Sequence, residues 1–432
     1  MPPAGRFALY LAVLGLTATL ATVPVATAGT PRPAILATTS LNSPDADRET
    51  GGFTPRSGVV LNDPMSYGRK RLIINRVIRS IENTAAGEYI RIAVWGYEDK
   101  ATTDAVVDAH QRGVHVQIVV ANGVINTNWF RTYAVLNEDK EDQSFAVRCS
   151  GGCRSPYLLH AKFVLISRVG QARNVSMVGS FNLTKRAALR QWNDMVTSRQ
   201  KDLYRALVRT FSEYARDRTL ANPFRVANLG KEKLTVWPSG GRNTIRQELD
   251  RVRCKIPPHA VRNGQRRTKI RIAIAGWFDD YGTHVARRLR TLWGQGCNVK
   301  IITTRAGAGV KRALRGGGGR GPVPIRQVSV DRNHNGTPEL YLHMKAMAIT
   351  GVFGGDPRAD VLFTGSPNWS RRAQRSDEII VRYRDVPLLA RKYSRHVDRL
   401  FSSRWAHRRT TSDAFGDRKD GESPPPAWFE LD

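Results

Sequence analysis

The chain has 432 residues, of which 41% are hydrophobic and 24% charged, with 37 Gly and 22 Pro. This length suits two or three domains with full cores, and the apolar fraction excludes a mainly disordered or collagen-like chain. With 68 Lys and Arg against 37 Asp and Glu, the formal net charge is +31. Such a surface attracts phosphates, whether in nucleic acid or on anionic lipid headgroups.

The first 28 residues are typical of a cleaved signal peptide. Arg6 is followed by an apolar run over residues 7–20, and Ala26-Thr27-Ala28 has the small-x-small pattern of a cleavage site. The run is short for a span of the bilayer, although an uncleaved anchor is the alternative. We therefore expect a secreted protein that is cleaved near Ala28 and begins with a flexible lead-in over residues 29–54.

The same succession of elements occurs twice in the rest of the chain. An apolar, β-branched run that predicts a buried strand is followed by a helical pattern, a Gly break and a second strand. The predicted ranges are 90–99, 103–112 and 114–120 in the first copy and 270–279, 283–293 and 298–303 in the second. Helices are predicted before each unit, at 71–82 and 244–252, and after it, at 203–215 and 388–401.

These β-α-β units indicate two copies of one α/β domain. We place the copies at residues 55–228 (the first repeat) and 229–410 (the second repeat). Residues 411–432 contain three consecutive prolines and are expected to form a disordered tail.

Four cysteines fit an oxidising destination, where an even count usually means disulfides. Cys149 and Cys153 bracket Ser-Gly-Gly, which allows a tight loop, so Cys254 and Cys297 are expected to form the second bridge. A zinc site is the rival interpretation, but one CxxxC with two distant partners is poor ligand spacing.

A small set of polar residues recurs at the same place in each repeat. The sets are His160, Lys162, Gly179, Ser180 and Asn182 in the first repeat, and His343, Lys345, Gly365, Ser366 and Asn368 in the second. Residues i and i+2 of a strand share a face, so each His projects beside its Lys from an otherwise apolar strand. Packing does not explain that desolvation cost. One His-x-Lys is usually a surface feature, but two matched copies favour function.

Each Gly-Ser-x-Asn element ends another apolar strand. Gly is expected to let the backbone approach a ligand, while the Ser hydroxyl and the Asn amide can bond phosphoryl oxygens. The two elements therefore predict a phosphate site.

These residues resemble the duplicated HxK and GSxN motifs of the phospholipase D superfamily, over nearly the whole mature chain. That family includes phospholipases D, cardiolipin and phosphatidylserine synthases, and phosphodiesterase nucleases. The resemblance implies an α/β fold of two repeated sandwich domains, related by a pseudo-two-fold axis, with one shared active site. It also implies a monomer that is an internal pseudo-dimer.

The resemblance further implies a two-step displacement at phosphorus, with no metal or cofactor. We assign His160 as the nucleophile that forms a phosphohistidine and His343 as the general acid. The groups expected to hold the non-bridging oxygens are Lys162, Lys345, Ser180, Asn182, Ser366 and Asn368.

The chain departs from the family pattern at two kinds of position. The family motif is usually HxKxxxxD, but Ser167 and Thr350 stand where the Asp is expected. An acidic residue after GSxN often orients a histidine. Glu378 fits that role in the second repeat, and either Asn193 or Asp194 must serve in the first.

Three functions follow from these observations. The first is a secreted phospholipase D that hydrolyses or transphosphatidylates glycerophospholipids at an anionic membrane surface, with Trp95, Trp277, Phe278 and Trp369 entering the headgroup interface. The second is an exported, metal-independent nuclease, favoured by the net charge and by the basic pairs Lys185-Arg186 and Arg371-Arg372. The third is a non-catalytic binder of anionic polymers or membranes, suggested by the two missing Asp residues.

Overall fold

The computed structural model describes residues 52–316, 319–333 and 338–407. The predicted signal peptide, most of the predicted lead-in and the predicted tail lie outside these residues. No helix within the described ranges is long and apolar enough to cross a bilayer. Phe53, which we expected in the flexible lead-in, is buried against the first repeat.

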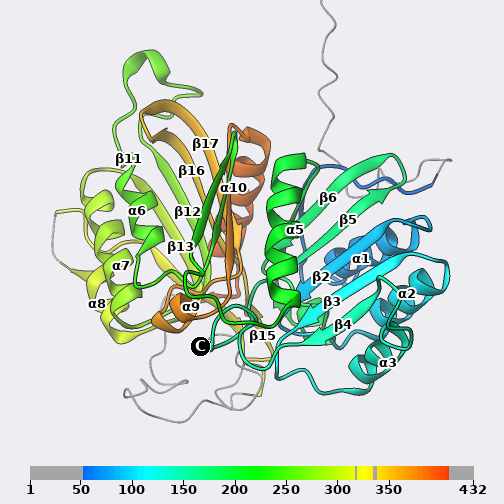
Figure 1. The fold of residues 1–432 in the computed structure, drawn as a ribbon. Helices are drawn as coiled ribbons and strands as arrows, with labels where there is room; N and C mark the ends of the chain where they lie inside the picture. Colours follow the sequence, from blue (N-terminus) through cyan, green and yellow to red (C-terminus); the bar gives the residue numbers. More distant parts are fainter. Residues whose placement is uncertain (1–51, 317–318, 334–337, 408–432) are drawn as a thin grey trace, which may run out of the picture. The chain divides into compact units, whose positions relative to one another are not determined.

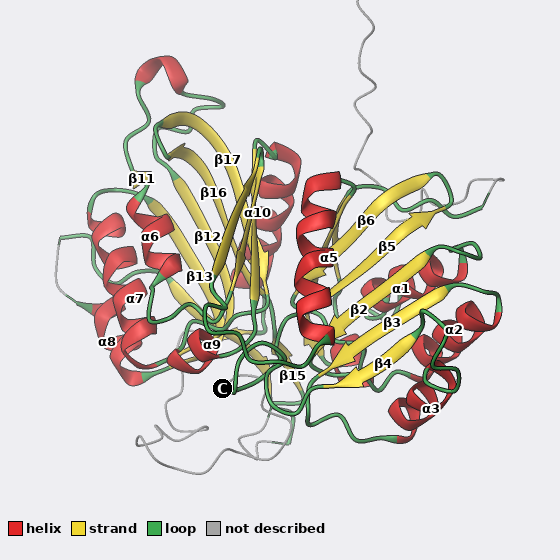
Figure 2. Cartoon of the chain, in the orientation of Figure 1, coloured by secondary structure: helices red, strands yellow, loops and turns green. Residues whose placement is uncertain are grey.

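The first repeat forms a seven-stranded sheet with helices on its faces (Figures 1 and 2). Its elements are β1 (Gly58–Leu61), α1 (Leu72–Glu82), β2 (Tyr89–Val94), α2 (Lys100–Gln111), β3 (His115–Val120), α3 (Thr127–Leu136), β4 (Phe145–Arg148), β5 (Phe163–Val169), β6 (Ala172–Gly179), α4 (Lys185–Leu189), β7 (Gln191–Trp192), β8 (Asp194–Ser198) and α5 (Lys201–Ala215). The strand order is β1-β8-β6-β5-β2-β3-β4, and β7 lies outside this sheet.

The second repeat forms a larger sheet. Its elements are β9 (Arg225–Leu229), β10 (Glu232–Val236), α6 (Thr244–Asp250), β11 (Val252–Arg253), a 3₁₀ turn (Pro258–Ala260), β12 (Lys269–Trp277), α7 (Asp279–Gly294), β13 (Asn298–Ala306), α8 (Ala308–Arg315), β14 (Ile325–Val330), β15 (Leu340–Leu342), β16 (Lys345–Phe353), β17 (Asp356–Gly365), α9 (Arg371–Arg375), β18 (Ile379–Arg384), α10 (Pro387–Phe401) and β19 (Ala406–His407).

Seven strands of the second sheet repeat the order of the first sheet. They run β10-β18-β17-β16-β12-β13-β14, with β9 added beside β10 and β15 beside β14. In both sheets the β-α-β pair is parallel, because a helix crosses over between its strands. The duplicated α/β class is therefore confirmed. Strand β9 belongs to the second sheet, although our boundary places most of it in the first repeat.

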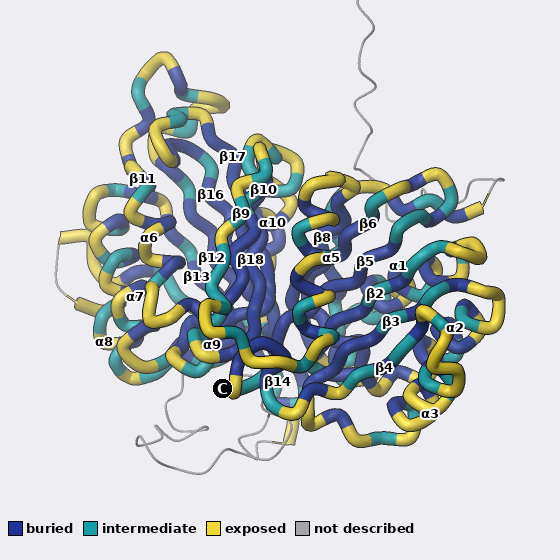
Figure 3. Tube along the Cα trace, viewed as in Figure 1, coloured by how far each residue is buried: buried dark blue, intermediate teal, exposed yellow. Residues whose placement is uncertain are grey.

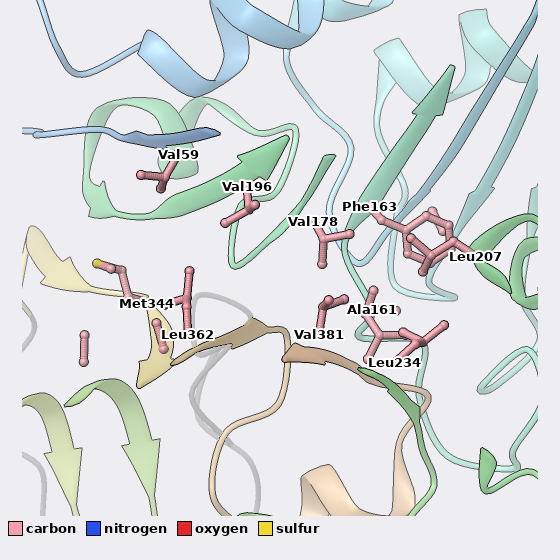
Figure 4. Packing of buried hydrophobic residues seen from close by; sticks show 14 of the residues in the cluster. Val59, Ala161, Phe163, Val178, Val196, Leu207, Leu234, Met344, Leu362 and Val381 are labelled. Carbon is pink, nitrogen blue, oxygen red and sulfur yellow. The ribbon is translucent and has the colours of Figure 1, made fainter. Parts of the chain in front are cut away.

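The two sheets share one hydrophobic core, as the predominantly buried inner strands in Figure 3 illustrate. Helices α5 and α10 lie between the sheets, and each contacts strands of both (Figure 1). Figure 4 shows side chains of the two repeats in this cluster, among them Phe163 and Leu207 from the first and Leu362 and Val381 from the second. The repeats therefore bury apolar surface jointly, which fixes the strand ends that carry the polar motifs.

Candidate active site

The backbone amide of each histidine forms a hydrogen bond with a segment from the other repeat. The amide of His160 donates to the carbonyl of Asp377 (2.9 Å), and the amide of His343 donates to the carbonyl of Trp192 (2.9 Å). Strand β7, which contains Trp192, pairs in parallel with β15 of the second sheet. Leu159 likewise makes a parallel bridge to Asp377. The repeats thus exchange short segments at the site.

The residue after each anchor orients the imidazole. Nδ1 of His160 lies 2.8 Å from Oε1 of Glu378, and Nδ1 of His343 lies 2.8 Å from Oδ1 of Asn193. Of the two alternatives in the first repeat, Asn193 holds the histidine. The carboxylate of Asp194 instead accepts hydrogen bonds from the hydroxyls of Thr364 and Tyr393.

The orientation of the Asn193 amide is set by its other bonds. Its Nδ2 donates to the carbonyl of Ala187 (3.2 Å) and to Oε1 of Gln191 (3.1 Å). Oδ1 therefore faces His343 as an acceptor, which requires the proton of that imidazole to be on Nδ1. Oδ1 also accepts from the hydroxyl of Ser180 (2.9 Å).

The two lysines are buried next to their histidines. Lys162 is 0% exposed and donates to the carbonyl of His160 (2.8 Å), and Lys345 donates to the carbonyl of His343 (2.8 Å). Nζ of Lys345 also lies 2.7 Å from Nε2 of His343. Burial raises the pKa of Glu378 to about 7, against the opposing attraction of Lys162 and Lys345. Since one carboxyl group interacts with both lysines, the two motifs converge on one place.

The Gly-Ser-x-Asn elements support the orienting residues. A Cβ on Gly179 or Gly365 would collide with the carbonyl oxygen of a residue in the neighbouring strand. We expected these glycines to allow a ligand to approach the backbone, but in the structure they allow a neighbouring strand to approach it. The hydroxyl of Ser180 accepts from the amide of Asp194 (3.1 Å), and that of Ser366 accepts from the amide of Ile379 (3.1 Å). Each serine thereby fixes the strand that follows an orienting residue.

The two asparagines of these elements are both buried. Oδ1 of Asn182 accepts from the amide of Gly96 (3.1 Å), at the end of β2. Asn368 occupies the corresponding place in the second repeat and is 2% exposed. Asn182 therefore contributes to the link between β2 and the loop after β6.

Ser167 and Thr350, which replace the Asp of the family motif, lie far from the histidines along their strands. Seven residues separate Ser167 from His160 and Thr350 from His343, or about 23 Å in an extended strand. The hydroxyl of Ser167 accepts from the amide of Tyr89 (2.8 Å) and donates to Glu88 (2.6 Å). Thr350 pairs across the strands with Asp360. Neither departure therefore removes a group from the histidine cluster.

Only part of the expected aromatic rim is exposed. Trp277 and Trp369 are buried and pack edge to face at 5.3 Å, so our expectation that they enter a headgroup interface is wrong. Trp95 is partly exposed, and its ring lies 6.5 Å from that of His160. Trp95 also lines a cavity of about 300 Å³ together with Ile125 and Arg186. Phe278 is partly buried beneath Arg305.

Sequence reasoning missed several residues that hold the site. Oδ1 of Asn62 accepts from the amide of Asn193 (2.6 Å), and the amide of Arg154 donates to Asp377 (2.8 Å). Asn62 follows β1 and Asp377 precedes Glu378, so only their neighbours in the sequence could have indicated a role. Both predicted disulfides, Cys149–Cys153 and Cys254–Cys297, are confirmed, which removes the zinc alternative for these cysteines.

Residues 77–215 match the family model described as "Cardiolipin synthase, PLD-like domain", and this range contains the first HxK and GSxN motifs. The first repeat therefore contains a phospholipase D-like domain. No curated protein matches the sequence of the chain. Among solved structures, the chain is similar to a phosphatidylserine synthase from Haemophilus influenzae Rd KW20 (12% identity, 81% of this chain and 86% of that one, TM-score 0.49).

Two further solved structures match parts of the chain. Nuc from Salmonella typhimurium, a phospholipase D family member, is 18% identical over 37% of this chain and 94% of its own (TM-score 0.29). A polyphosphate kinase from Porphyromonas gingivalis is 12% identical over 78% of this chain (TM-score 0.49). The chain spans about half of that kinase, 49% of its length.

Proposed function

We propose that this protein is a phospholipase D that cleaves glycerophospholipids through a phosphohistidine on His160, with His343 as the general acid. The observation that supports this division of roles is the unlike pair of orienting groups. His160 has the carboxyl group of Glu378 at Nδ1, whereas His343 has the neutral amide of Asn193.

The first step would form a bond between Nε2 of His160 and phosphorus and break the bond from phosphorus to the leaving alcohol. The phosphorylated imidazole retains its proton on Nδ1 and is therefore a cation, which the carboxylate of Glu378 stabilises at 2.8 Å. An imidazolium beside the amide of Asn193 lacks such a counter-charge and releases its proton more readily to the leaving oxygen.

The second step would reverse the roles of proton donor and acceptor. His343, now neutral, takes a proton from water or an alcohol, whose oxygen attacks phosphorus while the bond to Nε2 of His160 breaks. Lys162 and Lys345 would neutralise the non-bridging oxygens throughout, because both ammonium groups already lie beside the histidines. With water the product is phosphatidic acid, and with an alcohol it is a phosphatidyl-alcohol.

Exposed apolar side chains favour a lipid substrate. Ile125 is 66% exposed at the cavity that Trp95 lines, and Phe130 and Tyr133 are 54% and 49% exposed on the following helix α3. Phe130 and Tyr133 are three residues apart and share a helical face. Ile125 lies at the cavity lined by Trp95, whose ring is near that of His160, and Phe130 and Tyr133 extend the exposed apolar surface on α3. Such side chains suit an acyl-chain environment better than a solvated polynucleotide.

One observation supports the nuclease as a second candidate. Arg372 and Arg375 lie over the ring of Tyr157, at 5.6 and 4.8 Å from its centroid. Cationic groups beside an aromatic ring are typical of surfaces that bind single-stranded nucleic acid. Secretion is likewise part of our proposal, because two disulfides and the predicted signal peptide both fit an exported protein.

The test is a parallel assay on phosphatidylcholine vesicles and on single- and double-stranded DNA. We expect phosphatidic acid from the vesicles, and phosphatidylethanol when ethanol is added. DNA cleavage without phosphatidic acid would replace the lipid substrate with nucleic acid. Binding to either polymer or membrane without turnover would refute the enzymatic proposal.

A further inference from the structure

A small loop of the first repeat reaches the segment that carries Glu378. The loop is closed by the disulfide between Cys149 and Cys153, both buried. The chain continues through Arg154, whose guanidinium is 1% exposed and lies 2.9 Å from Glu213 on α5. The same side chain donates to the carbonyl of Pro223 (2.5 Å). Arg154 therefore fixes the loop both to α5 and to the segment that follows α5.

Asp377 is held by this loop on its side chain and by its own backbone. Oδ2 accepts from the amide of Arg154 (2.8 Å), and the neighbouring amides of Cys153 and Ser155 lower the pKa of the carboxyl group. The backbone amide of Asp377 donates to the carbonyl of Leu158 (2.8 Å). Its carbonyl accepts from the amides of His160 (2.9 Å) and Ala161 (2.8 Å). Three consecutive amides around a carboxylate form an anion-binding concavity.

The corresponding position of the first repeat contains no carboxylate. Trp192 anchors His343 as Asp377 anchors His160, and Trp192 is 0% exposed. An apolar side chain therefore satisfies packing at this place in the fold. Burial of Asp377 raises its pKa to about 6, in spite of the amides, so the carboxyl group has a cost that packing does not require.

We propose that Asp377 and the loop closed by Cys149 and Cys153 form a positioning clamp that holds Glu378 at Nδ1 of His160. Asp377 is a positioning residue, since it acts through Glu378 and His160. The inference rests on the proposed role of His160 and is independent of whether the substrate is a lipid or a nucleic acid.

The packing around Gly152 shows how little freedom the clamp has. A Cβ on Gly152 would lie 2.9 Å from Oδ2 of Asp377 and would collide with Ser155. The loop therefore closes against the carboxyl group without space for a side chain. A change in its closure is transmitted to Asp377 and to the residue that follows it.

The two disulfides provide the test and its matched control. The bridge at the clamp spans 4 residues, whereas Cys254–Cys297 spans 43 and lies in the hydrophobic cluster of the second repeat, outside the histidine site. Because the entropy that a bridge removes from the unfolded chain grows with loop length, the longer bridge should contribute more to stability. The clamp bridge should nevertheless matter more for turnover.

The experiment compares Cys149→Ala/Cys153→Ala with Cys254→Ala/Cys297→Ala in the full chain, with bis(p-nitrophenyl) phosphate as a soluble substrate. For the folded clamp variant we expect kcat to fall about tenfold or more with KM within about twofold, as for a displaced catalytic group. The control should keep kcat within about twofold while its Tm falls further. Wild-type kcat in the folded clamp variant, or equal losses in the two variants, would overturn the clamp.

Substitutions of Asp377 test the same inference if the clamp variant does not fold. Asn retains one acceptor for the Arg154 amide and Ala retains none, so kcat should decrease in the order wild type, Asp377→Asn, Asp377→Ala. The proton on Nδ1 of His160, observed by NMR, should shift in both variants and not in the Cys254/Cys297 control. If the wild type cleaves neither the soluble diester nor phospholipid vesicles nor DNA, the proposed function fails, and this signal still decides the clamp: an unshifted proton overturns it.

Discussion

The two repeats hold the backbones of their histidines in the same way but place different side chains at Nδ1 of the imidazoles. In each, a backbone carbonyl from the opposite repeat receives the histidine amide, and the next residue contacts Nδ1. In one case that residue is a carboxylic acid and in the other it is an amide. The backbone duplication therefore builds two equivalent imidazole sites, and a single side chain in each provides the asymmetry on which the proposed acid and nucleophile roles rest.

The strongest test of this comparison removes each imidazole in turn. His160→Ala and His343→Ala should each lower kcat by about 10⁴-fold or more, because groups that act as a unit fail together. With a p-nitrophenyl diester, whose leaving group needs no proton, His343→Ala should accumulate phosphohistidine, whereas His160→Ala should not. Mass spectrometry of the quenched protein distinguishes them, and phosphate found only on His343 would reverse our assignment.

Exchanging the orienting groups should have a smaller and unequal effect. Glu378→Gln should lower kcat by about 10²- to 10³-fold, since Gln can neither offset the phosphoimidazolium charge nor keep the proton on Nδ1 reliably. Asn193→Ala should cost about 10-fold to 100-fold, because only a neutral hydrogen bond is lost. Steady-state kinetics on one soluble diester provides both values. Equal losses would show that the carboxyl group confers no distinction between the histidines.

The two orienting residues, Glu378 and Asn193, also differ in how they affect the pH dependence of stability. Burial raises the pKa of Glu378 from 4.5 to about 7, so the folded protein binds this proton more tightly than the unfolded chain. The stability from that proton is present below pH 4.5 and is lost as the pH rises to about 7, by on the order of 3 kcal/mol.

Glu378→Gln should remove this loss and leave the slopes from the other carboxyl groups whose pKa is raised by burial, chiefly Asp377 and Asp279. Denaturant titrations between pH 4.5 and 8 should then show the less active Gln variant to be more stable than the wild type at pH 8. Asn193→Ala is the control and should retain the wild-type slope, because it replaces a neutral group. A Gln variant with an unchanged slope would contradict the pKa shift of Glu378.

The smallest effects are expected at the positions where the family Asp is absent. Ser167→Asp and Thr350→Asp should change kcat less than about twofold, since both positions are about 23 Å along the strand from a histidine. Ser167→Asp places a second carboxylate beside Glu88 and should cost about 1 kcal/mol of stability. A large gain in kcat from either variant would show that these departures do weaken the site.

Local sequence patterns predicted the β-α-β units, and the structure contains them. The same periodicity predicted that His160 and Lys162 project from one strand, and that prediction is wrong: both residues lie immediately before β5 (Phe163–Val169). Their place there depends on the hydrogen bonds of His160 to the second repeat, which no local pattern encodes. Periodicity did not distinguish Asn193 from Asp194, because Asn193 follows Ser180 by 13 residues while Glu378 follows Ser366 by 12 (378 − 366). Because these two separations differ by one residue, alignment of the two repeats could not tell whether Asn193 or Asp194 corresponds to Glu378.

The remaining contacts join residues too distant in sequence for any local pattern to encode. Pairing of β7 with β15 and of Leu159 with Asp377 depends on how the two sheets pack. The burial of Trp277 and Trp369 has the same origin, since each ring fills space against the other rather than facing the site. Aromatic residues near a motif are as suitable for a core as for a rim, and only the packed fold decides between them.

The exchange of segments between the repeats determines when, during synthesis, the protein can first act. His160 leaves the ribosome 218 residues before Glu378, a delay of about 10–40 s at typical elongation rates. Until the second repeat has been made and folded, neither histidine contacts its orienting residue. A chain truncated before that point is therefore expected to be inactive rather than partly active. On the proposed function, an incomplete chain therefore has no assembled site with which to cleave phosphodiesters.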